Sequence, residues 1–439
     1  MGILLFSPGQ AAALLFGAFF LLLALRVPVA VALGLACLPM LALEPQLSLM
    51  LLVQETFNAY NSFILLAVPF FLLTANLMNI GGITDRLVRL SRALVGRLPG
   101  SLAQVNVVLS IFFAGISGSS TADAASQGKI FIDAQIKEGY DKSFSVAITA
   151  VSAVMAVIIP PSILMIVWGG VLTTSIGALF LAGIVPGLLI GLVQMVTVHL
   201  YAVRRGYPTY ASSTLREMVI AFWVSIPALM TPVIIIGGKI FGWFTATESA
   251  AVAVIYAAAL SVLVYREMDL KGLYGALLDT GRLAGVTLFC VGTASAFGWM
   301  MAYYQIPQSL LANILSWSMS PTTAGLFIAL VFLVVGCFLD AIPAIIIVGA
   351  ILQPLAKSVG MDPVHFAMIG IVSLAFGLVT PPYGLCLMIS CAVANVRMRT
   401  VLKDVLIMLL PMLGVLLLVI IWPQVSLFLP GLISPEMLR

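Results

Sequence analysis

Long uninterrupted apolar runs recur along the chain from Leu14 to Trp422, and they constrain its fold more than any other feature. They are about 17 to 25 residues long, the length that crosses a bilayer core as a helix. Of the 439 residues 62% are apolar and only 8% are charged, which is too little charge to cover an ordinary water-soluble surface. Because backbone polar groups in lipid need internal partners, and because these runs do not alternate with polar residues, helices are expected. The sequence therefore predicts an all-α polytopic membrane protein.

The runs predict ten crossings, at residues 11–25, 28–45, 61–80, 143–172, 176–203, 218–238, 246–264, 279–303, 363–392 and 405–423. No Lys or Arg precedes the first run and Arg26 follows it, which is the reverse of a cleaved signal peptide, so it is expected to be a true span. The five cysteines have no metal-ligand spacing and the two histidines are isolated. We expect no cofactor and no transition metal.

Two further segments are interrupted rather than continuous. An amphipathic stretch at 84–99 precedes residues 102–140, whose return limb carries Asp123, Lys129 and Asp133. A second amphipathic stretch at 306–320 precedes residues 324–360, which are interrupted at 340–343. We interpret 102–140 and 324–360 as re-entrant hairpins, because the first return limb is too polar to face lipid.

The basic residues fix the predicted orientation. With the amino terminus outside, seventeen of the 20 Lys and Arg fall on the cytoplasmic side, and only Lys239, Lys357 and Arg439 fall outside. Both termini are therefore expected on the external side of the membrane, with lipid around the spans. The excess of positive charge serves this topology, and no nucleic-acid partner is expected.

The landmarks repeat across the two halves of the chain. Asp123 and Asp340 are 217 residues apart, and Pro160 and Pro381 are 221 residues apart. Five crossings per half place the second repeat in inverted orientation, as in alternating-access transporters. We expect scaffold spans and an arm helix in 1–100 and again in 206–320, with transport parts in 101–205 and 321–439; the arm is cytoplasmic in the first repeat and periplasmic in the second.

Each transport part is expected to hold a hairpin, a broken helix, at 159–162 or 380–384, and a last span. The first hairpin turns at residues 115–123, where small residues and hydroxyls can offer oxygens to a hard cation. A close helix contact made by small residues is the alternative. Acids at membrane depth are expensive and favour a functional role for Asp123 and Asp340, although either could cap a helix.

Paired prolines interrupt the fourth and ninth spans. Two consecutive prolines remove two N–H donors and free carbonyl oxygens near mid-membrane, where a bound Na⁺ could satisfy them. A simple kink is the alternative for one such pair, but two at matched positions favour ion sites. No Lys or Arg stands near either break or hairpin tip, so an anionic substrate would depend on helix N-termini, hydroxyls and bound Na⁺.

Several ordered motifs resemble the large permease subunit of tripartite ATP-independent periplasmic (TRAP) transporters over essentially the whole chain. They are residues 99–106, 113–119, 122–125, 139–140 and 159–162. The resemblance implies an elevator fold like that of the ion transporter superfamily, Na⁺ coupling, and uptake of a small organic acid such as a C4-dicarboxylate or sialic acid. It also implies two partners, a small membrane subunit, expected here as a separate chain, and a periplasmic substrate-binding protein.

The same resemblance assigns the site residues. Sodium ligands are expected in two groups: Ser117, Gly118, Ser119, Asp123, Pro160 and Pro161 in the first repeat, and Gly336, Asp340, Thr380, Pro381, Pro382 and Gly384 in the second. Substrate is expected at Ser119, Ser120, Thr121, Ser162 and Tyr383.

Three other functions compete with this prediction. A related Na⁺-dicarboxylate carrier that needs no binding protein would share the hairpins and the repeat. An intramembrane enzyme is disfavoured because the chain has no HExxH or GxSxG motif. A channel is disfavoured because two halves that form one closed site do not make a ring.

Overall fold

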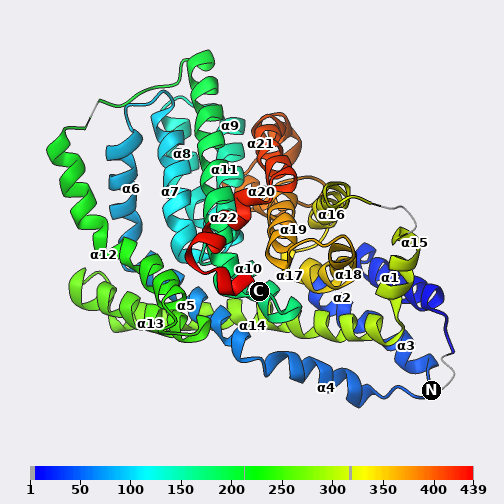
Figure 1. The fold of residues 1–439 in the computed structure, drawn as a ribbon. Coiled ribbons are helices and arrows are strands. Elements are labelled where there is room, and N and C mark those ends of the chain that lie inside the picture. Colours follow the sequence, from blue (N-terminus) through cyan, green and yellow to red (C-terminus); the bar gives the residue numbers. More distant parts are fainter. Residues whose placement is uncertain (1–4, 212, 316–318, 439) are drawn as a thin grey trace.

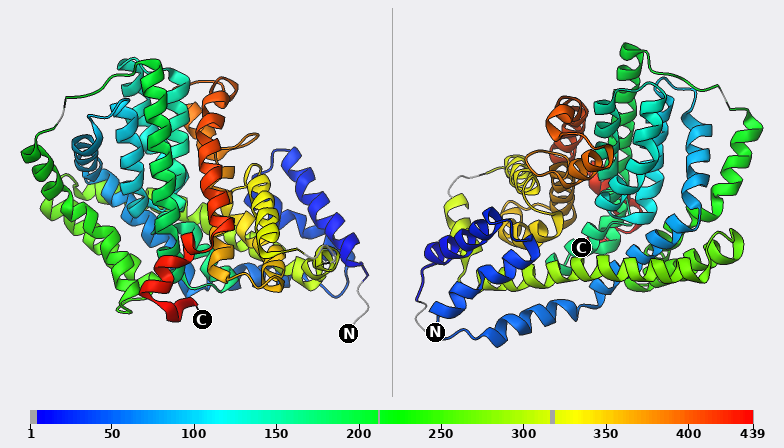
Figure 2. Two further views of the ribbon diagram at one scale, coloured as in Figure 1. Left: turned by 45° about the horizontal axis from the view of Figure 1, so that its top comes forward. Right: turned by 180° about the vertical axis from the view of Figure 1, so that it is seen from behind.

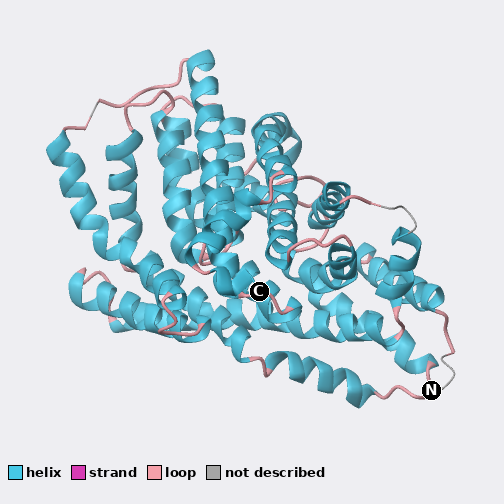
Figure 3. Cartoon of the chain, viewed as in Figure 1, coloured by secondary structure: helices cyan, strands magenta, loops and turns pink. Residues whose placement is uncertain are grey.

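A computed structural model describes residues 5–211, 213–315 and 319–438. Over these residues the chain is helical and contains no strand (Figure 3), which confirms the predicted all-α class. Residues 1–4, 316–318 and Arg439 lie outside the described part, so the end of the predicted 306–320 arm and one of the three external basic residues are not placed.

Seven helices among the described residues are long and apolar enough to span a membrane. Six match predicted crossings and the seventh is the return limb of the second hairpin; they are Phe63–Ile80, Ile176–Arg205, Leu215–Ile240, Ala246–Val264, Leu270–Tyr303, Met398–Ile421 and Ala341–Ser358. The other four predicted crossings are built from shorter apolar helices, namely α1 (Pro8–Ala24), α2 (Val29–Ala36) with α3 (Leu38–Leu43), and the two interrupted by prolines.

The first half of the chain follows the predicted order. After α1 to α3 come α4 (Leu49–Tyr60), η1 (Phe63–Leu66) with α5 (Ala67–Ile80), and the amphipathic α6 (Ile83–Val95). The hairpin is α7 (Ser101–Ser117) and α8 (Ser120–Lys137), followed by α9 (Lys142–Ala153) with η2 (Val154–Val157), α10 (Ile163–Leu172) and α11 (Ile176–Arg205).

The second half repeats most of this order, without a counterpart of α4 and with α22 and η5 added at its end. It contains α12 (Leu215–Ile240), α13 (Ala246–Ala259) with η3 (Leu260–Val264), α14 (Leu270–Tyr303) and α15 (Ile306–Leu315). The second hairpin is α16 (Pro321–Gly336) with α17 (Ala341–Ala344), η4 (Ile345–Gly349) and α18 (Ala350–Ser358). Then come α19 (Pro363–Gly377), α20 (Leu385–Ala394), α21 (Met398–Ile421), α22 (Gln424–Ile433) and η5 (Pro435–Leu438).

Several boundaries differ from the sequence prediction: α21 begins seven residues before the predicted 405, and α22 was not predicted. Helix α4 was predicted as a connection, and α14 begins nine residues before the predicted start at 279. The two helices pack along each other at the edge of the molecule, with α4 beneath α14 in Figure 1. Gln54, Glu55 and Asn58 interrupt the apolar residues of α4, and Lys271 lies at the start of α14, which is why hydropathy missed both.

The helices pack as two groups. Helices α5, α13, α14, α12 and α6 contact one another on one side, and α8, α9, α11, α19, α20 and α21 contact one another on the other (Figures 1 and 2). The second group combines elements from both halves of the chain.

A polar network ties the halves of this second group together near the ends of α11 and α8. Asp404 of α21 is buried and accepts hydrogen bonds from Ser143 (2.5 Å), Tyr201 (3.2 Å) and Arg205 (3.2 Å). Arg205 also pairs with Asp141 at 2.6 Å, and hydrogen bonding from Tyr207, with help from Arg205, lowers the pKa of the Asp141 carboxyl. Helices α9, α11 and α21 are therefore joined where the sequence places many of its basic residues.

Candidate functional site

The first hairpin turns because its tip residues suit a reversal. Gly118 ends α7 with a φ of +61°, a left-handed conformation that glycine adopts without strain. Ser119 then caps α8 by accepting a hydrogen bond from the Ala122 amide at 3.4 Å. The tip packs on the first proline break, because a Cβ on Gly118 would lie 2.8 Å from the Pro161 carbonyl oxygen, and Ile163 N donates to the Gly118 carbonyl at 3.3 Å.

The first break leaves carbonyl oxygens without partners. The carbonyl oxygens of Ile159, Pro160 and Pro161 accept no hydrogen bond from any residue that the structure describes. Ser162 is already engaged, since its hydroxyl donates to the Val157 carbonyl at 2.7 Å and caps α10. This break is buried, so its free carbonyls are groups that a dehydrated cation could use.

Asp123 lies behind this tip, in the first turn of α8. Its side chain is only 1% exposed, and one carboxylate oxygen accepts a hydrogen bond of 2.5 Å from the Ser117 hydroxyl. The other oxygen has no partner in the described part of the chain. Asp123 does not cap α8, because Ser119 does.

The second tip and the second break also meet. Tyr383 N donates to the Cys337 carbonyl at 3.0 Å, and a Cβ on Gly377 would lie 2.6 Å from the backbone of Gly336. Gly384, with a φ of +48°, starts α20, and the Thr380 hydroxyl donates to Phe376 O at 2.7 Å. The carbonyl oxygens of Thr380 and Pro381 accept no hydrogen bond from the described residues.

Asp340 differs from Asp123 in its capping role and in its exposure. It is the N-cap of α17, with its carboxylate accepting from the Ala341 amide at 2.8 Å. The side chain is partly exposed and lines a cavity, so a capping role and an ion-binding role are both compatible with its position. Pro382 and Tyr383 are exposed, which makes the second break the more open of the two.

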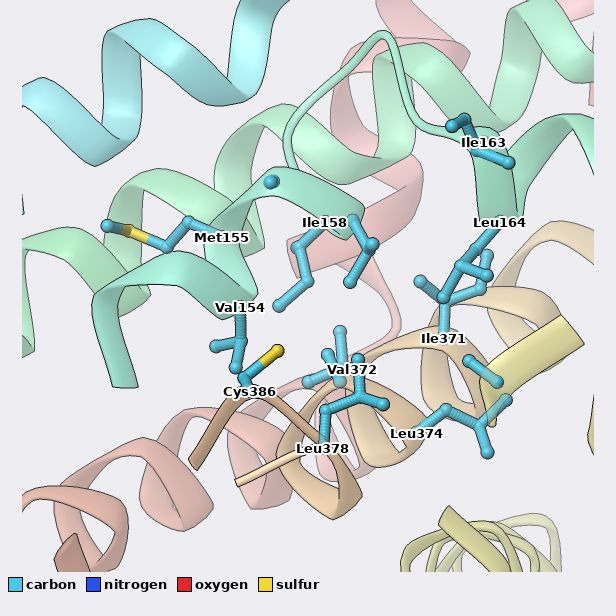
Figure 4. Close-up of a cluster of buried hydrophobic side chains, with 14 of the residues drawn as sticks. Val154, Met155, Ile158, Ile163, Leu164, Ile371, Val372, Leu374, Leu378 and Cys386 are labelled. Carbon is cyan, nitrogen blue, oxygen red and sulfur yellow. The ribbon is translucent and has the colours of Figure 1, made fainter. Parts of the chain in front are cut away.

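The two broken helices cross through an apolar cluster. Figure 4 shows Val154 and Ile158 of the first broken helix facing Val372, Leu378 and Cys386 of the second. Cys386 and its four counterparts along the chain are free and buried, as small core residues should be. Buried apolar contacts therefore join the two broken helices.

A cavity of about 440 Å³, which we name the central cavity, lies between the two hairpin tips. Ser119, Ser120 and Thr121 of the first tip and Asp340 of the second line it. Of the other predicted site residues, Gly118 also reaches it, whereas Ser162 and Tyr383 are not among its described lining residues. The Ser120 hydroxyl is buried and has no hydrogen-bond partner in the described part of the chain.

The opposite wall of the cavity comes from the first group of helices and was not predicted. It includes Leu72 of α5 and Leu283 and Thr287 of α14. None of the described lining residues is Lys or Arg, so positive charge for an anion has to come from elsewhere. A concave, mainly apolar space with converging hydroxyls is typical of a small-molecule site.

Residues 16–425 match the protein family described as the tripartite ATP-independent periplasmic transporter, DctM component. The chain belongs to the DctM family. It is therefore a membrane permease component of a TRAP transporter, and the predicted family is confirmed.

Two relatives illustrate the similarity along the chain. "Uncharacterized protein YgiK" of Salmonella typhimurium is 42% identical over 428 residues, covering 96% of this chain and 98% of the relative. "Sialic acid TRAP transporter large permease protein SiaM" of Vibrio cholerae is 38% identical over 406 residues, covering 92% and 95%.

A solved structure shares the fold. The Alcanivorax borkumensis YdaH transporter, described as having an unusual topology, superposes with a TM-score of 0.56 over 85% of this DctM chain and 87% of its own, at 14% identity. At that identity the likeness concerns the fold alone.

Proposed function

We propose that this DctM protein imports a small organic acid, such as a C4-dicarboxylate or sialic acid, together with Na⁺ and after delivery by a periplasmic binding protein. The central cavity carries this proposal, because both hairpin tips and the scaffold side meet around it. Unpartnered carbonyl oxygens at both breaks and a buried carboxylate at Asp123 supply hard oxygen ligands for a cation such as Na⁺.

Sodium coupling would also explain how a cavity without Lys or Arg holds an anion. A tenfold Na⁺ gradient supplies about 1.4 kcal/mol per ion, and a potential of 100 mV supplies about 2.3 kcal/mol per net charge. Two ions moving with a monovalent anion would therefore provide about 5 kcal/mol. Bound Na⁺ would offset the negative charge of the substrate carboxylate.

The mechanism that we propose is an elevator. Residues 1–100 and 206–320 would form the scaffold, and 101–205 and 321–439 would carry the substrate past it. The packing of α8, α9, α11, α19, α20 and α21 into one group supports a transport part that moves as a unit. Both termini would lie in the periplasm, and a small membrane subunit, encoded as a separate chain, would bind the scaffold.

Reconstituted uptake tests the proposal. The purified permease, with its small membrane subunit, is placed in proteoliposomes and offered a panel of labelled organic acids, with and without Na⁺ and the binding protein. We expect uptake of at least one acid to require both additions.

Two outcomes would count against parts of this proposal. Uptake with Na⁺ alone would favour the related carrier that needs no binding protein, and equal uptake without Na⁺ would refute the coupling.

A further inference from the structure

A second cavity, of about 590 Å³, opens at the seam between the proposed scaffold and transport parts. The scaffold contributes Phe63 and Ile64 of η1 together with Lys239 and Thr247, and the transport part contributes residues 169–170 and 173–176. We name it the outer cavity, because Lys239 is among the few basic residues that the charge pattern places outside.

Positive potential gathers in the outer cavity. Lys239 stands at the N-terminus of the 30-residue α11, with its Cε 3.4 Å from the position that a Cβ on Gly177 would occupy. The amide N–H groups of Ile176 and Gly177 have no acceptor among the described residues. A helix N-terminus and an ammonium group both attract anions.

Lys239 forms no ion pair with any residue that the structure describes. Thr174 also lines the outer cavity, is only 8% exposed and has no hydrogen-bond partner within the described part of the chain. The Thr174 hydroxyl and the unpaired ammonium of Lys239 line the same cavity, so both are available to a polar ligand.

Helix α10 and the continuous segment of η1 and α5 line both cavities. Helix α10 lines the central cavity with Ile163 and Leu164 and the outer cavity with Gly169 and Gly170. Six residues of helix separate Leu164 from Gly170, a rise of about 9 Å. On the scaffold side, Leu72 lines the central cavity and Ile64 the outer one, so the two spaces lie along one seam.

We propose that the outer cavity is a capture site that holds the carboxylate or sulfonate group of the incoming substrate before it reaches the central cavity. This inference rests on the proposed function and orientation. Lys239 and the α11 N-terminus attract the anion, and Thr174 donates a hydrogen bond to it. The substrate then passes to the central cavity when the transport part moves relative to the scaffold.

Thiol protection tests the capture site. Phe63 lines the outer cavity and is 57% exposed, whereas the five native cysteines are buried, so Phe63→Cys provides a selective reporter. A membrane-impermeant maleimide is added to intact cells with saturating succinate, sialic acid or isethionate, each tested separately. We expect at least one acid to slow labelling, and Lys239→Gln to abolish that protection.

Lys357 supplies the matched control, since it is exposed, lies outside by the same charge pattern and does not line the cavity. Lys357→Gln should leave protection intact. In uptake assays Lys239→Gln should raise KM about tenfold with little change in kcat, the effect of removing one charge near an anion in a partly solvated site. Lys239→Arg should restore most of the affinity.

Three results would overturn the capture site. Labelling could be insensitive to every acid, or protection could survive in Lys239→Gln, which would indicate a conformational change at the central cavity. Alternatively, Lys239→Gln could raise only the concentration of binding protein required, which would assign Lys239 to docking of an acidic side chain. Absence of Na⁺-dependent uptake by the unmodified transporter would instead refute the proposed function itself.

Discussion

Replacement of Asp123 by Asn removes one buried charge and keeps the shape of the side chain. The Ser117 hydroxyl lies 2.5 Å from the carboxylate, so a Na⁺ bound to that hydroxyl would stand within about 5 Å of the charge. At that distance, and with an effective dielectric constant of about 20, the interaction is worth about 3 kcal/mol. We therefore expect Asp123→Asn to raise the Na⁺ concentration for half-maximal uptake by about two orders of magnitude.

Stability separates this role from a structural one. Asn can still accept the hydrogen bond from Ser117, so the thermal stability of the purified complex should change little. Ala would leave the buried hydroxyl unpaired and should cost about 1 to 3 kcal/mol. The assay is a Na⁺ titration of uptake in proteoliposomes, run beside a thermal melt of each variant.

Asp133→Asn is the matched control. Asp133 lies on the same helix, α8, but is exposed and does not line the central cavity, so its Na⁺ dependence should match the wild type. If Asp123→Asn transports with an unchanged Na⁺ requirement, Asp123 is not part of an ion site and the reasoning from its burial fails.

Three further predictions concern Asp340, Gly377 and the orientation of the carboxy terminus. Asp340→Asn should weaken Na⁺ activation and preserve folding, because Asn caps a helix about as well as Asp; Ala at this N-cap should lower the melting temperature, and an Asn variant with unaltered Na⁺ response would make Asp340 a cap only. Gly377→Ala should destabilise the protein by about 1 to 3 kcal/mol, since its Cβ would lie 2.6 Å from the Gly336 backbone, whereas Gly275→Ala, with no atom within 4 Å, should be tolerated in the same thermal melt. A reporter fused to the carboxy terminus should be active in the periplasm, and activity only in the cytoplasm would overturn the proposed orientation.

The hairpins and breaks could be predicted because their residues are unfavourable in a continuous lipid-exposed helix. Gly118 and Ser119 reverse the chain, and paired prolines cannot continue a helix. The hairpin boundaries lie within a few residues of the predicted ones, and each tip packs on the break predicted for it. These features are local, so the sequence carries them directly.

The scaffold wall of the central cavity could not be predicted in the same way. Leu283 is 48% exposed and sits in an apolar helix whose other exposed residues, such as Val286, have the same character. Nothing in the local pattern distinguishes a leucine that faces a cavity from one that faces lipid. Only tertiary packing brings Leu283 and Thr287 opposite the hairpin tips.

The charge-bearing ends of helices were missed for a related reason. Hydropathy ends a span where charge begins, but a helix can continue beyond the bilayer core with its backbone bonds intact. The start of α14 at Leu270 is an instance, because Lys271 is exposed on it. The outer cavity could not be predicted either, because its lining residues come from three separate segments, 63–64, 169–176 and 239–247.

Accumulation of substrate against its own gradient tests the central claim most directly. Proteoliposomes holding the complete transporter are loaded with equal concentrations of the labelled acid inside and outside, clamped at zero membrane potential, and given an inward tenfold Na⁺ gradient with loaded binding protein outside. Two coupled ions would supply about 2.8 kcal/mol, enough to concentrate the acid about a hundredfold at equilibrium. We predict net accumulation that a Na⁺ ionophore abolishes. Equal concentrations on both sides at every Na⁺ gradient would contradict sodium-coupled transport.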